Sequence, residues 1–290
     1  MNTTTKEPVY IIIPVHNRKQ ITLNCLEHLQ KTGDLQRYYV VVVDDASTDG
    51  TAEAIQSLYA GVTVLPGNGD LWWTGAIAKG MEYAYTQKAE YFIWLNDDCL
   101  PNPGTLPQLV DFLKNRPNSI AAPTCYIQQD NSLIKQYNGS QGRKNCAANL
   151  GEVIEVDSMS GWCVGIPVSV FGKIGSPNAE KFPHYCGDDM YIFKATRSGF
   201  KAYLLGDLKT ILIGPVNEMG NFQKYFRPGL PAKQTLRSLF WNKKSPYRLP
   251  TKFFYFVERY GVFLGSLLFL LKLTTWFKEW AYLQLSLSKN

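Results

Sequence analysis

The most informative chemical groups in this chain are oxygen-bearing side chains that follow a short apolar run. Residues 91–95 (Tyr-Phe-Ile-Trp-Leu) lead directly into Asn96, Asp97 and Asp98. A buried strand that ends here delivers carboxylates to the edge of a sheet, where open α/β proteins bind their ligands. Mg²⁺ and Mn²⁺ prefer such oxygen ligands and commonly combine one or two carboxylates with substrate phosphates. The alternative is that these acids simply end a strand in solvent.

A second acidic pair, Asp44 and Asp45, follows the apolar residues 39–43. If both runs are parallel strands of one sheet, their carboxyl ends meet at the same crevice. A carboxylate in that position can accept hydrogen bonds from a nucleotide base or a ribose. The competing interpretation is an ordinary strand-to-helix turn, with Ser47 and Asp49 as turn formers.

The third candidate is the segment His184-Tyr-Cys-Gly-Asp-Asp189, which precedes a helical pattern over residues 190–198. A general base needs one carboxylate at the rim of the crevice, and Asp189 or Asp188 would supply it. Carboxylates near a helix N-terminus also stabilise the helix through its dipole, so capping is the alternative.

Alternating strands and helices must position these groups. The pattern predicts strands over 10–16, 39–43, 62–65 and 91–95, with helices over 19–31, from 51 onward and over 75–87. This order predicts an α/β fold, a doubly wound and mostly parallel sheet flanked by helices. Residues 119–150 are expected to form loops and short strands. Strands are predicted over 153–156 and 162–166.

The composition is that of a folded protein in a reducing compartment. The 290 residues are 45% hydrophobic and 13% aromatic, which is enough for a packed core. The six cysteines are scattered without a C-x-x-C pair, which argues against a zinc site and a disulfide framework. The first turn has no glycine fingerprint and the chain has no P-loop, which argues against a dehydrogenase and a P-loop enzyme.

The C-terminal part, residues 216–290, is expected to be a basic linker followed by an aromatic-rich helical extension of the 1–215 domain. The net charge is +6, and residues 219–257 contain eight basic and no acidic side chains. Because no nucleic-acid motif accompanies this block, an anionic membrane or a phosphate-bearing acceptor is the expected partner. Residues 252–287 form a helical region that packs on the domain, spans a membrane, or lies at the membrane interface through Trp276, Trp280 and Tyr282.

Together the motifs resemble the inverting glycosyltransferases of family 2, which have the GT-A fold. The resemblance covers about residues 9–220 and rests on Ile-Ile-Pro-Val-His-Asn-Arg18, Val-Val-Asp-Asp-Ala-Ser-Thr-Asp-Gly50, Gly67-Asn-Gly-Asp-Leu-Trp-Trp-Thr-Gly-Ala76, Leu95-Asn-Asp-Asp98, Ser160-Gly-Trp-Cys-Val-Gly165 and Gly187-Asp-Asp-Met190. The Gly-Asn…Trp-Trp-x-Gly stretch is most similar to bacterial, rhamnosyltransferase-like enzymes that build surface polysaccharides.

The resemblance implies a role for each motif. Asp189 is the first choice for the catalytic base and Asp188 the second, while Asp98 is the implied metal ligand. The residues implied for the nucleotide-sugar donor are Pro14, His16, Asn17, Asp45, Asn68, Trp73, Gly75, Lys79, Asn96 and Asp97. The acceptor side is assigned to Gly161, Trp162 and His184.

The chain departs from the family pattern at two of these motifs. The Asp-x-Asp motif has Asn96 in place of its first acid, and the usual Glu-Asp pair is Asp188-Asp189. No histidine follows Gly199, so a histidine metal ligand is not expected in that region.

The expected function is therefore a metal-dependent glycosyltransferase, with Mn²⁺ or Mg²⁺, that moves a sugar from a nucleotide diphosphate sugar to a glycan or lipid-linked acceptor in cell-surface polysaccharide synthesis. The expected place is the cytoplasm, at the inner face of the plasma membrane. Two alternatives remain: a catalytically weak nucleotide-sugar-binding scaffold partner, and a sugar nucleotidyltransferase. The latter would have a Gly-rich basic loop after the first strand, and none is present.

Overall fold

The computed structural model describes residues 5–129, 132–214, 222–226 and 229–287. The strands are β1 (Val9–Val15), β2 (Tyr39–Asp44), β3 (Val62–Pro66), β4 (Tyr91–Leu95), β5 (Cys99–Pro101), β6 (Ser119–Gln129), β7 (Ser132–Lys135), β8 (Gly139–Gln141), β9 (Lys144–Cys146), β10 (Val153–Val156), β11 (Ser158–Met159), β12 (Cys163–Pro167) and β13 (Lys201–Leu212). The helices are α1 (Lys19–Lys31), α2 (Asp34–Arg37), α3 (Thr51–Leu58), α4 (Trp72–Thr86), α5 (Thr105–Asn115), α6 (Val168–Ile174), α7 (Gly187–Arg197), α8 (Phe222–Tyr225), α9 (Ala232–Phe240), α10 (Leu249–Tyr260) and α11 (Val262–Leu287).

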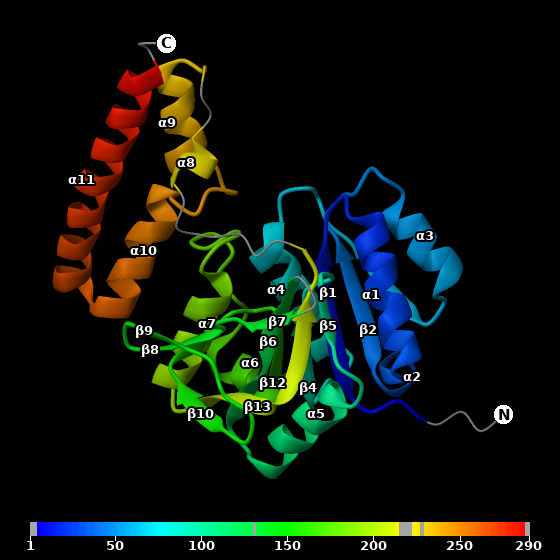
Figure 1. Cartoon of the computed structure of the whole chain (residues 1–290). Helices are drawn as coiled ribbons and strands as arrows, with labels where there is room; N and C mark the ends of the chain where they lie inside the picture. Colours follow the sequence, from blue (N-terminus) through cyan, green and yellow to red (C-terminus); the bar gives the residue numbers. More distant parts are fainter. Residues whose placement is uncertain (1–4, 130–131, 215–221, 227–228, 288–290) are drawn as a thin grey trace.

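A mixed, mainly parallel sheet forms the centre of the molecule (Figure 1). Its strand order is β10-β13-β6-β12-β4-β1-β2-β3. The four strands at one side, β4, β1, β2 and β3, are parallel, as are β6 and β13. β12 joins these two parallel groups and runs antiparallel to both of its neighbours. The predicted α/β class is therefore confirmed, with one reversed strand in the middle.

Side chains of β1 alternate between two hydrophobic cores, one on each face of the sheet. Ile11 and Ile13 belong to the core that α1, α3 and α5 cover, whereas Tyr10 and Ile12 belong to the core that α4, α6 and α7 cover. Successive side chains of a strand point to opposite faces, so a strand buried on both faces is apolar throughout. This is why residues 10–15 form an uninterrupted apolar run around Pro14.

Strand β6 differs from what the sequence pattern predicts, and no element is predicted for the residues of β13. Residues 119–150 were expected to form loops and short strands, but β6 spans Ser119–Gln129. The sequence pattern does not indicate a long strand here because Pro123 and Thr124 lie inside β6, and proline is normally excluded from the interior of a strand. The register between β6 and β13 shifts between Leu205 and Lys209, and this irregularity lies next to Pro123. Strand β13 passes the same place with Gly206 in close contact with the backbone of Asn149.

The C-terminal helices α8–α11 form a group of their own beside α7 (Figure 1). The predicted domain boundary near residue 215 lies outside the described residues. Instead of an irregular basic stretch, residues 232–240 form α9, and the expected helical region consists of two helices, α10 and α11. The chain reverses at Gly261, whose φ is +82°, and Gly265 then packs against the backbone of Phe256. Both positions favour glycine, for its conformational freedom and its lack of a Cβ.

The helical group has a third hydrophobic core, built from Phe222, Phe226, Leu239, Phe240, Tyr247, Phe269 and Trp276. Two of the predicted interfacial anchors point into it. Trp276 packs edge-on against Tyr247, and the indole N–H of Trp280 donates to Thr235 at 2.9 Å. Tyr282, the third, is 71% exposed. No helix in the described part of the chain is long and apolar enough to cross a membrane.

Candidate active site

Asp45 organises the loop that connects β3 to α4. Its backbone N–H donates to Val15 O at 2.9 Å, which fixes it at the edge where β1 and β2 end. Its carboxylate accepts the N–H of Gly69 at 2.7 Å and that of Trp72 at 3.0 Å. Gly67 lies so close that a Cβ there would be 2.6 Å from Asp45 Oδ1. The loop is therefore wrapped around this buried carboxylate.

His16 and Asn17 join the first two strand ends. His16 Nδ1 lies 2.6 Å from Asp45 O, and Asn17 Nδ2 lies 3.1 Å from His16 Nε2. Because the amide nitrogen of Asn17 can only donate, His16 Nε2 accepts and the ring hydrogen is on Nδ1. Asn17 Oδ1 in turn accepts the N–H of Thr48 at 2.7 Å. Asp49 then binds the N–H of Lys19 and of Thr51, so it caps α1 and α3 together.

Trp73 connects this loop to the end of β4. Its indole N–H donates to Asn96 Oδ1 at 2.8 Å, and its ring stacks edge-on against Trp94. Asn96 N donates to Trp162 O at 2.9 Å, so the residues just before β12 lie beside the end of β4. Asn96 therefore accepts a hydrogen bond from Trp73 through its amide oxygen. Unlike an aspartate at this position, it does so without a negative charge.

Arg18 neutralises the two acids that follow β4. Its Nη2 lies 3.1 Å from Asp97 Oδ1 and 2.8 Å from Asp98 Oδ2. Asp97 is 3% exposed and also accepts the Thr22 hydroxyl at 2.9 Å. Burial raises the pKa of Asp97 to about 6, while the Arg18 charge acts in the opposite direction. The side chain of Asp98 is 32% exposed, so of the two it is the one open to a ligand.

The donor set for a divalent cation is small. Within the described parts of the chain, no three His, Cys, Asp or Glu side chains gather as a complete metal cage. Asp97 is committed to Thr22 and Arg18, which leaves Asp98 as the accessible carboxylate. This fits a hard cation that takes one protein carboxylate and draws its other ligands from a diphosphate and water, the usual arrangement for Mg²⁺. The predicted role of Asp98 is compatible with this geometry.

Asp188 belongs to the same site because Gly161 holds it. The N–H of Gly161 donates to Asp188 Oδ2 at 2.7 Å, and the Trp73 ring packs directly on Gly161. Burial raises the pKa of Asp188 to about 6, and the Gly161 hydrogen bond opposes that shift. A carboxyl group with such a pKa is ionised at neutral pH yet close enough to accept a proton, as a general base must.

Asp189 faces the C-terminal helices instead. Its Oδ2 lies 3.4 Å from Nη1 of Arg259 on α10, and its side chain is 27% exposed. Burial raises the pKa of Asp189, whereas the hydrogen bond with Ser158 and the charge of Arg259 lower it. Both predicted base candidates thus lie in the first turn of α7, with different neighbours.

His184 lies in edge-on contact with Trp72 and Tyr185. Burial and the nearby charge of Lys244 lower its pKa to about 4, so its ring is neutral at pH 7. Its Nδ1 is buried and has no hydrogen-bond partner among the described residues. The place of His184 on the acceptor side stays a prediction.

Other predicted residues lie near the site with structural contacts of their own. Gly75 packs against Leu71 on α4, and Lys79 donates to the carbonyl of Pro66 at the end of β3. Asn68 Oδ1 accepts the N–H of Asp70. Pro14 lies within β1, and Trp162 is partly buried against the first core.

Sequence reasoning missed two arginines that contact the predicted acids, Arg18 and Arg259. Arg18 was quoted only as the last residue of a motif, although its position directly before α1 brings it to the β4 end. Arg259 gave no signal at all, because the contact between α10 and α7 spans 70 residues of sequence.

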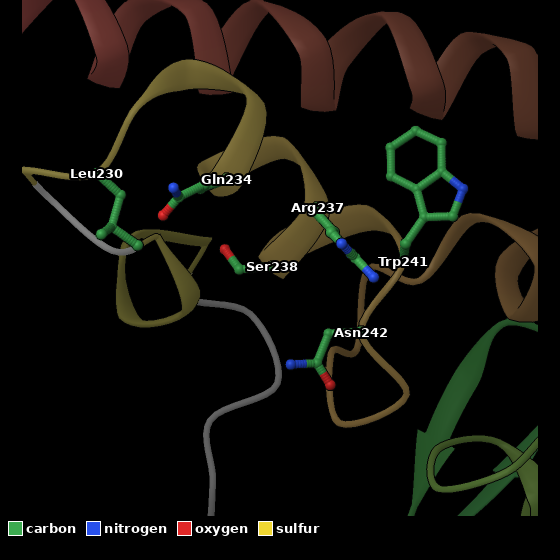
Figure 2. A pocket seen from close by; sticks show the side chains of 6 residues that line it. All are labelled: Leu230, Gln234, Arg237, Ser238, Trp241 and Asn242. Carbon is green, nitrogen blue, oxygen red and sulfur yellow. The ribbon is translucent and has the colours of Figure 1, made fainter.

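A cavity of about 380 Å³ lies elsewhere, in the C-terminal helical group (Figure 2). Leu230, Gln234, Arg237, Ser238, Trp241 and Asn242 line it. None of the predicted site residues is among them. Gln234, Arg237 and Ser238 lie on α9, and the other three lie on the segments beside it. We therefore locate the site at the strand ends, where the polar contacts are.

Comparisons with known proteins agree with this arrangement. The sequence model of glycosyl transferase family 2 matches residues 10–175, more than half of the chain. No curated protein is significantly similar in sequence.

Solved structures share the fold at low identity. GalNAc-T7 with UDP, GalNAc and Mn²⁺ gives a TM-score of 0.60 at 16% identity, covering 85% of this chain and 50% of that one. The mannosyltransferase PcManGT from Pyrobaculum calidifontis, with GDP-Man and Mn²⁺, gives 0.56 at 18%, covering 97% and 86%. S. aureus TarS 1–349 with UDP gives 0.55 at 14%, covering 72% and 61%. This chain thus spans half of GalNAc-T7 and less than two thirds of TarS 1–349. The family match and the GT-A architecture together show that the chain belongs to glycosyl transferase family 2, as its motifs predict.

Proposed function

We propose that this protein transfers a sugar from a nucleotide diphosphate sugar to a hydroxyl group of a glycan or lipid-linked acceptor, with inversion at the anomeric carbon. One observation carries the proposal: two adjacent tryptophans link Asp45 to the ends of β4 and α7. The N–H of Trp72 donates to Asp45, while Trp73 donates to Asn96 and packs on Gly161, whose N–H donates to Asp188. Family membership supports it. The solved structures with UDP or GDP-Man support a nucleotide-sugar donor.

The donor half of the site would be the edge formed by β1, β2 and the loop around Asp45. Its carboxylate has lone pairs beyond those used by Gly69 and Trp72, so it can also accept from a nucleotide base. His16 and Asn17 build the adjacent wall. Trp73 offers an aromatic face next to Asn96, which suits a sugar ring.

The leaving diphosphate needs positive charge as the glycosidic bond breaks. Asp98 would hold the cation, and a bound Mn²⁺ or Mg²⁺ supplies charge neutralisation on the leaving group. Arg18 already lies against Asp98 and contributes a second, permanent positive charge at this place. Its Nε is buried without a hydrogen-bond partner among the described residues, so it retains a donor for an anionic ligand.

The proton of the acceptor hydroxyl would go to a carboxylate of α7. We assign this role to Asp189 first and to Asp188 second. Asp188 is held by the Gly161 N–H and so serves to fix the segment before β12. Asp189 is partly exposed, and its contacts with Ser158 and, at 3.4 Å, with Arg259 leave it able to accept a proton. Attack from the face opposite the leaving group gives inversion in one displacement.

The test is a panel of UDP-, GDP- and dTDP-sugars with Mn²⁺ or Mg²⁺, scored by release of the nucleoside diphosphate. We expect release from one donor, loss of release on chelation, and loss with Asp98→Ala. Asp111→Ala removes an exposed carboxylate from α5 and should leave release unchanged. Retained activity in Asp98→Ala would contradict the metal role.

A catalytically weak, nucleotide-sugar-binding scaffold is the second candidate. Asn96 in place of an acid favours it, because one ligand carboxylate is lost. Calorimetric binding of UDP, GDP and dTDP separates the two: binding without turnover, even with acceptor glycans added, would favour the scaffold. A sugar nucleotidyltransferase would instead release pyrophosphate from a nucleoside triphosphate. We further propose that the enzyme acts in polysaccharide synthesis and has a rhamnosyltransferase-like specificity.

We also propose that the C-terminal helices bind an anionic membrane surface at the inner face of the plasma membrane. The support is a row of exposed apolar side chains at the start of α11: Val262, Phe263, Leu264, Leu267, Leu270 and Leu271. Phe263 is 94% exposed. Lys272 and Lys278 lie on the same helix, and such a combination suits anionic lipid.

The basic side chains of residues 219–257 are less available to lipid than their number suggests, because some of them have partners within the protein. Lys243 pairs with Asp70 at 2.6 Å, and Arg248 donates to Thr251. Replacing Lys243, Lys244 and Arg248 with glutamate is still expected to weaken vesicle binding, but it would also disturb the site. Phe263→Glu is the cleaner test, with Leu58→Glu on the exposed surface of α3 as control. Unchanged partitioning of Phe263→Glu into anionic vesicles would refute the membrane proposal.

A further inference from the structure

Arg259 is a buried cation at the junction of α10 with the GT-A domain. Its side chain is 4% exposed. Nη2 donates to Gly142 O at 2.8 Å, to Asp157 Oδ1 at 2.9 Å and to Ser140 Oγ at 3.1 Å. Nη1 contacts Ser158 Oγ at 3.2 Å and Asp189 Oδ2 at 3.4 Å. One guanidinium thus joins the C-terminal helices to α7, β8 and the segment around β11.

The distances show how the guanidinium is used. The shorter bonds, to Gly142 and Asp157, anchor the guanidinium, and the ring of Phe193 on α7 lies 4.8 Å from its centre. The contact to Asp189 is the longest of the set. A tight bidentate pair would occupy both carboxylate oxygens. Here the guanidinium of Arg259 is a fixed positive charge beside Asp189, and it leaves the carboxylate able to accept a proton.

We propose that Arg259 is a positioning residue that orients Asp189 and keeps it ionised, so that helix α10 is an integral part of the active site. The inference rests on the proposed function, in which Asp189 is the first choice for the base. It gives the C-terminal helices a role in the chemistry that is separate from membrane binding.

The charges around Asp189 set the direction of the effect. From α10 it faces Arg259, Lys252 and Tyr255, from the β11 segment Asp157, and on its own element Asp188 and Cys186. Arg259 and Lys252 favour the carboxylate, while burial and Asp157 favour the protonated form. Since a general base works only when deprotonated, removing Arg259 must move the acid limb of the pH–rate profile to higher pH.

The test compares Arg259→Gln with Arg259→Lys and with the control Arg197→Gln. Arg197 is exposed on α7 and lies over the same Phe193 ring, but it does not contact Asp189 in the structure. An opposite charge at such distances lowers a carboxyl pKa by about 1 unit or more. We expect Arg259→Gln to shift the acid limb of kcat/KM upward by about 1 pH unit. At pH values below the acid limbs of both proteins, the rate of this variant should then fall roughly tenfold more than at pH 8, where the base is ionised in both. Arg259→Lys should restore most of the profile, and Arg197→Gln should match wild type.

A second variant protects the test from a folding defect. Asp157→Asn keeps Arg259 in place and removes a negative charge, so it should move the acid limb in the opposite direction, to lower pH. If Arg259→Gln does not fold, Asp157→Asn decides. A wild-type pH profile for Asp157→Asn would overturn the proposal.

A readout without turnover separates this inference from the proposed function. The carboxyl pKa of Asp189 can be followed by ¹³C NMR, with its signal assigned from Asp189→Asn. If no donor is cleaved by wild type, the transferase proposal fails while the NMR titration still reports on Arg259. An unchanged Asp189 pKa in Arg259→Gln would overturn the electrostatic role of Arg259, whatever the activity.

Discussion

Replacing Gly161 with alanine tests the centre of the site. A Cβ at this position would lie 2.4 Å from Trp73 Cζ2 and 2.6 Å from Cη2. Ordinary van der Waals contact begins at about 3.4 Å, so the indole must move by about 1 Å. The ring has little freedom, because Asn96 accepts its N–H at 2.8 Å and Trp94 packs against it.

The expected cost has two parts. Overpacking a rigid site costs about 1 to 3 kcal/mol. Losing the Trp73–Asn96 hydrogen bond costs about 0.5 to 1.5 kcal/mol more. The sum, about 2 to 4 kcal/mol, corresponds to a fall in Tm of roughly 4 to 12 °C for a chain of this size. A displacement of about 1 Å in a catalytic site can reduce the rate on the order of 100-fold.

The assays are thermal unfolding and nucleoside diphosphate release from the accepted donor. Gly172→Ala is the matched control, since Gly172 lies in α6 with no atom within 4 Å of its added Cβ. It should keep full activity and gain about 0.5 to 1 kcal/mol, the usual effect of alanine over glycine in a helix. A Gly161→Ala protein with wild-type Tm and donor affinity would show that Trp73 is not fixed in the way described.

Three further variants test other parts of the structure. Asp45→Ala should destabilise the protein by about 2 to 4 kcal/mol, since two backbone N–H groups lose a charged acceptor, and abolish calorimetric binding of the nucleotide; retained binding would argue against Asp45 as the base-binding residue. Asp188→Asn should gain stability relative to wild type between pH 4 and pH 7, by about 1 to 2 kcal/mol. The sign follows because the folded pKa of about 6 lies above the usual value of about 3.9, so ionising the buried carboxyl costs stability as pH rises; a pH-independent difference in urea unfolding would refute this. Gly206→Ala should yield little soluble protein, because its Cβ would lie 1.6 Å from the backbone oxygen of Asn149, which cannot rotate away; wild-type yield and Tm would contradict the path of β13.

The N-terminal half shows what local sequence can determine. The apolar runs at residues 10–15, 39–43 and 91–95 became β1, β2 and β4, and helices α1, α3 and α4 lie between them or next to them. Alternation of this kind leaves few topologies, because right-handed crossovers place the strand ends together. Asp45 and Asp98 could therefore be assigned to one edge before any contact was known.

The second half was harder because its strands do not follow one another in space. β12 inserts between β4 and β6 and runs antiparallel to both, which brings Gly161 beside Trp73. β6 contains a proline, and β13 carries an irregular register beside it. Local sequence patterns indicate which residues are buried and where the chain turns. They do not indicate which distant strand becomes a neighbour.

By itself the sequence determined the family, the α/β alternation and the acids that follow β2 and β4 and begin α7, since each is written in short stretches of adjacent residues. Only the tertiary structure decided the partners of those acids. Arg18 reaches Asp98 across 80 positions, and Arg259 reaches Asp189 across 70. The packing of the elements brings these charges together. It is driven by the burial of many apolar side chains, and this burial sets the position of each arginine.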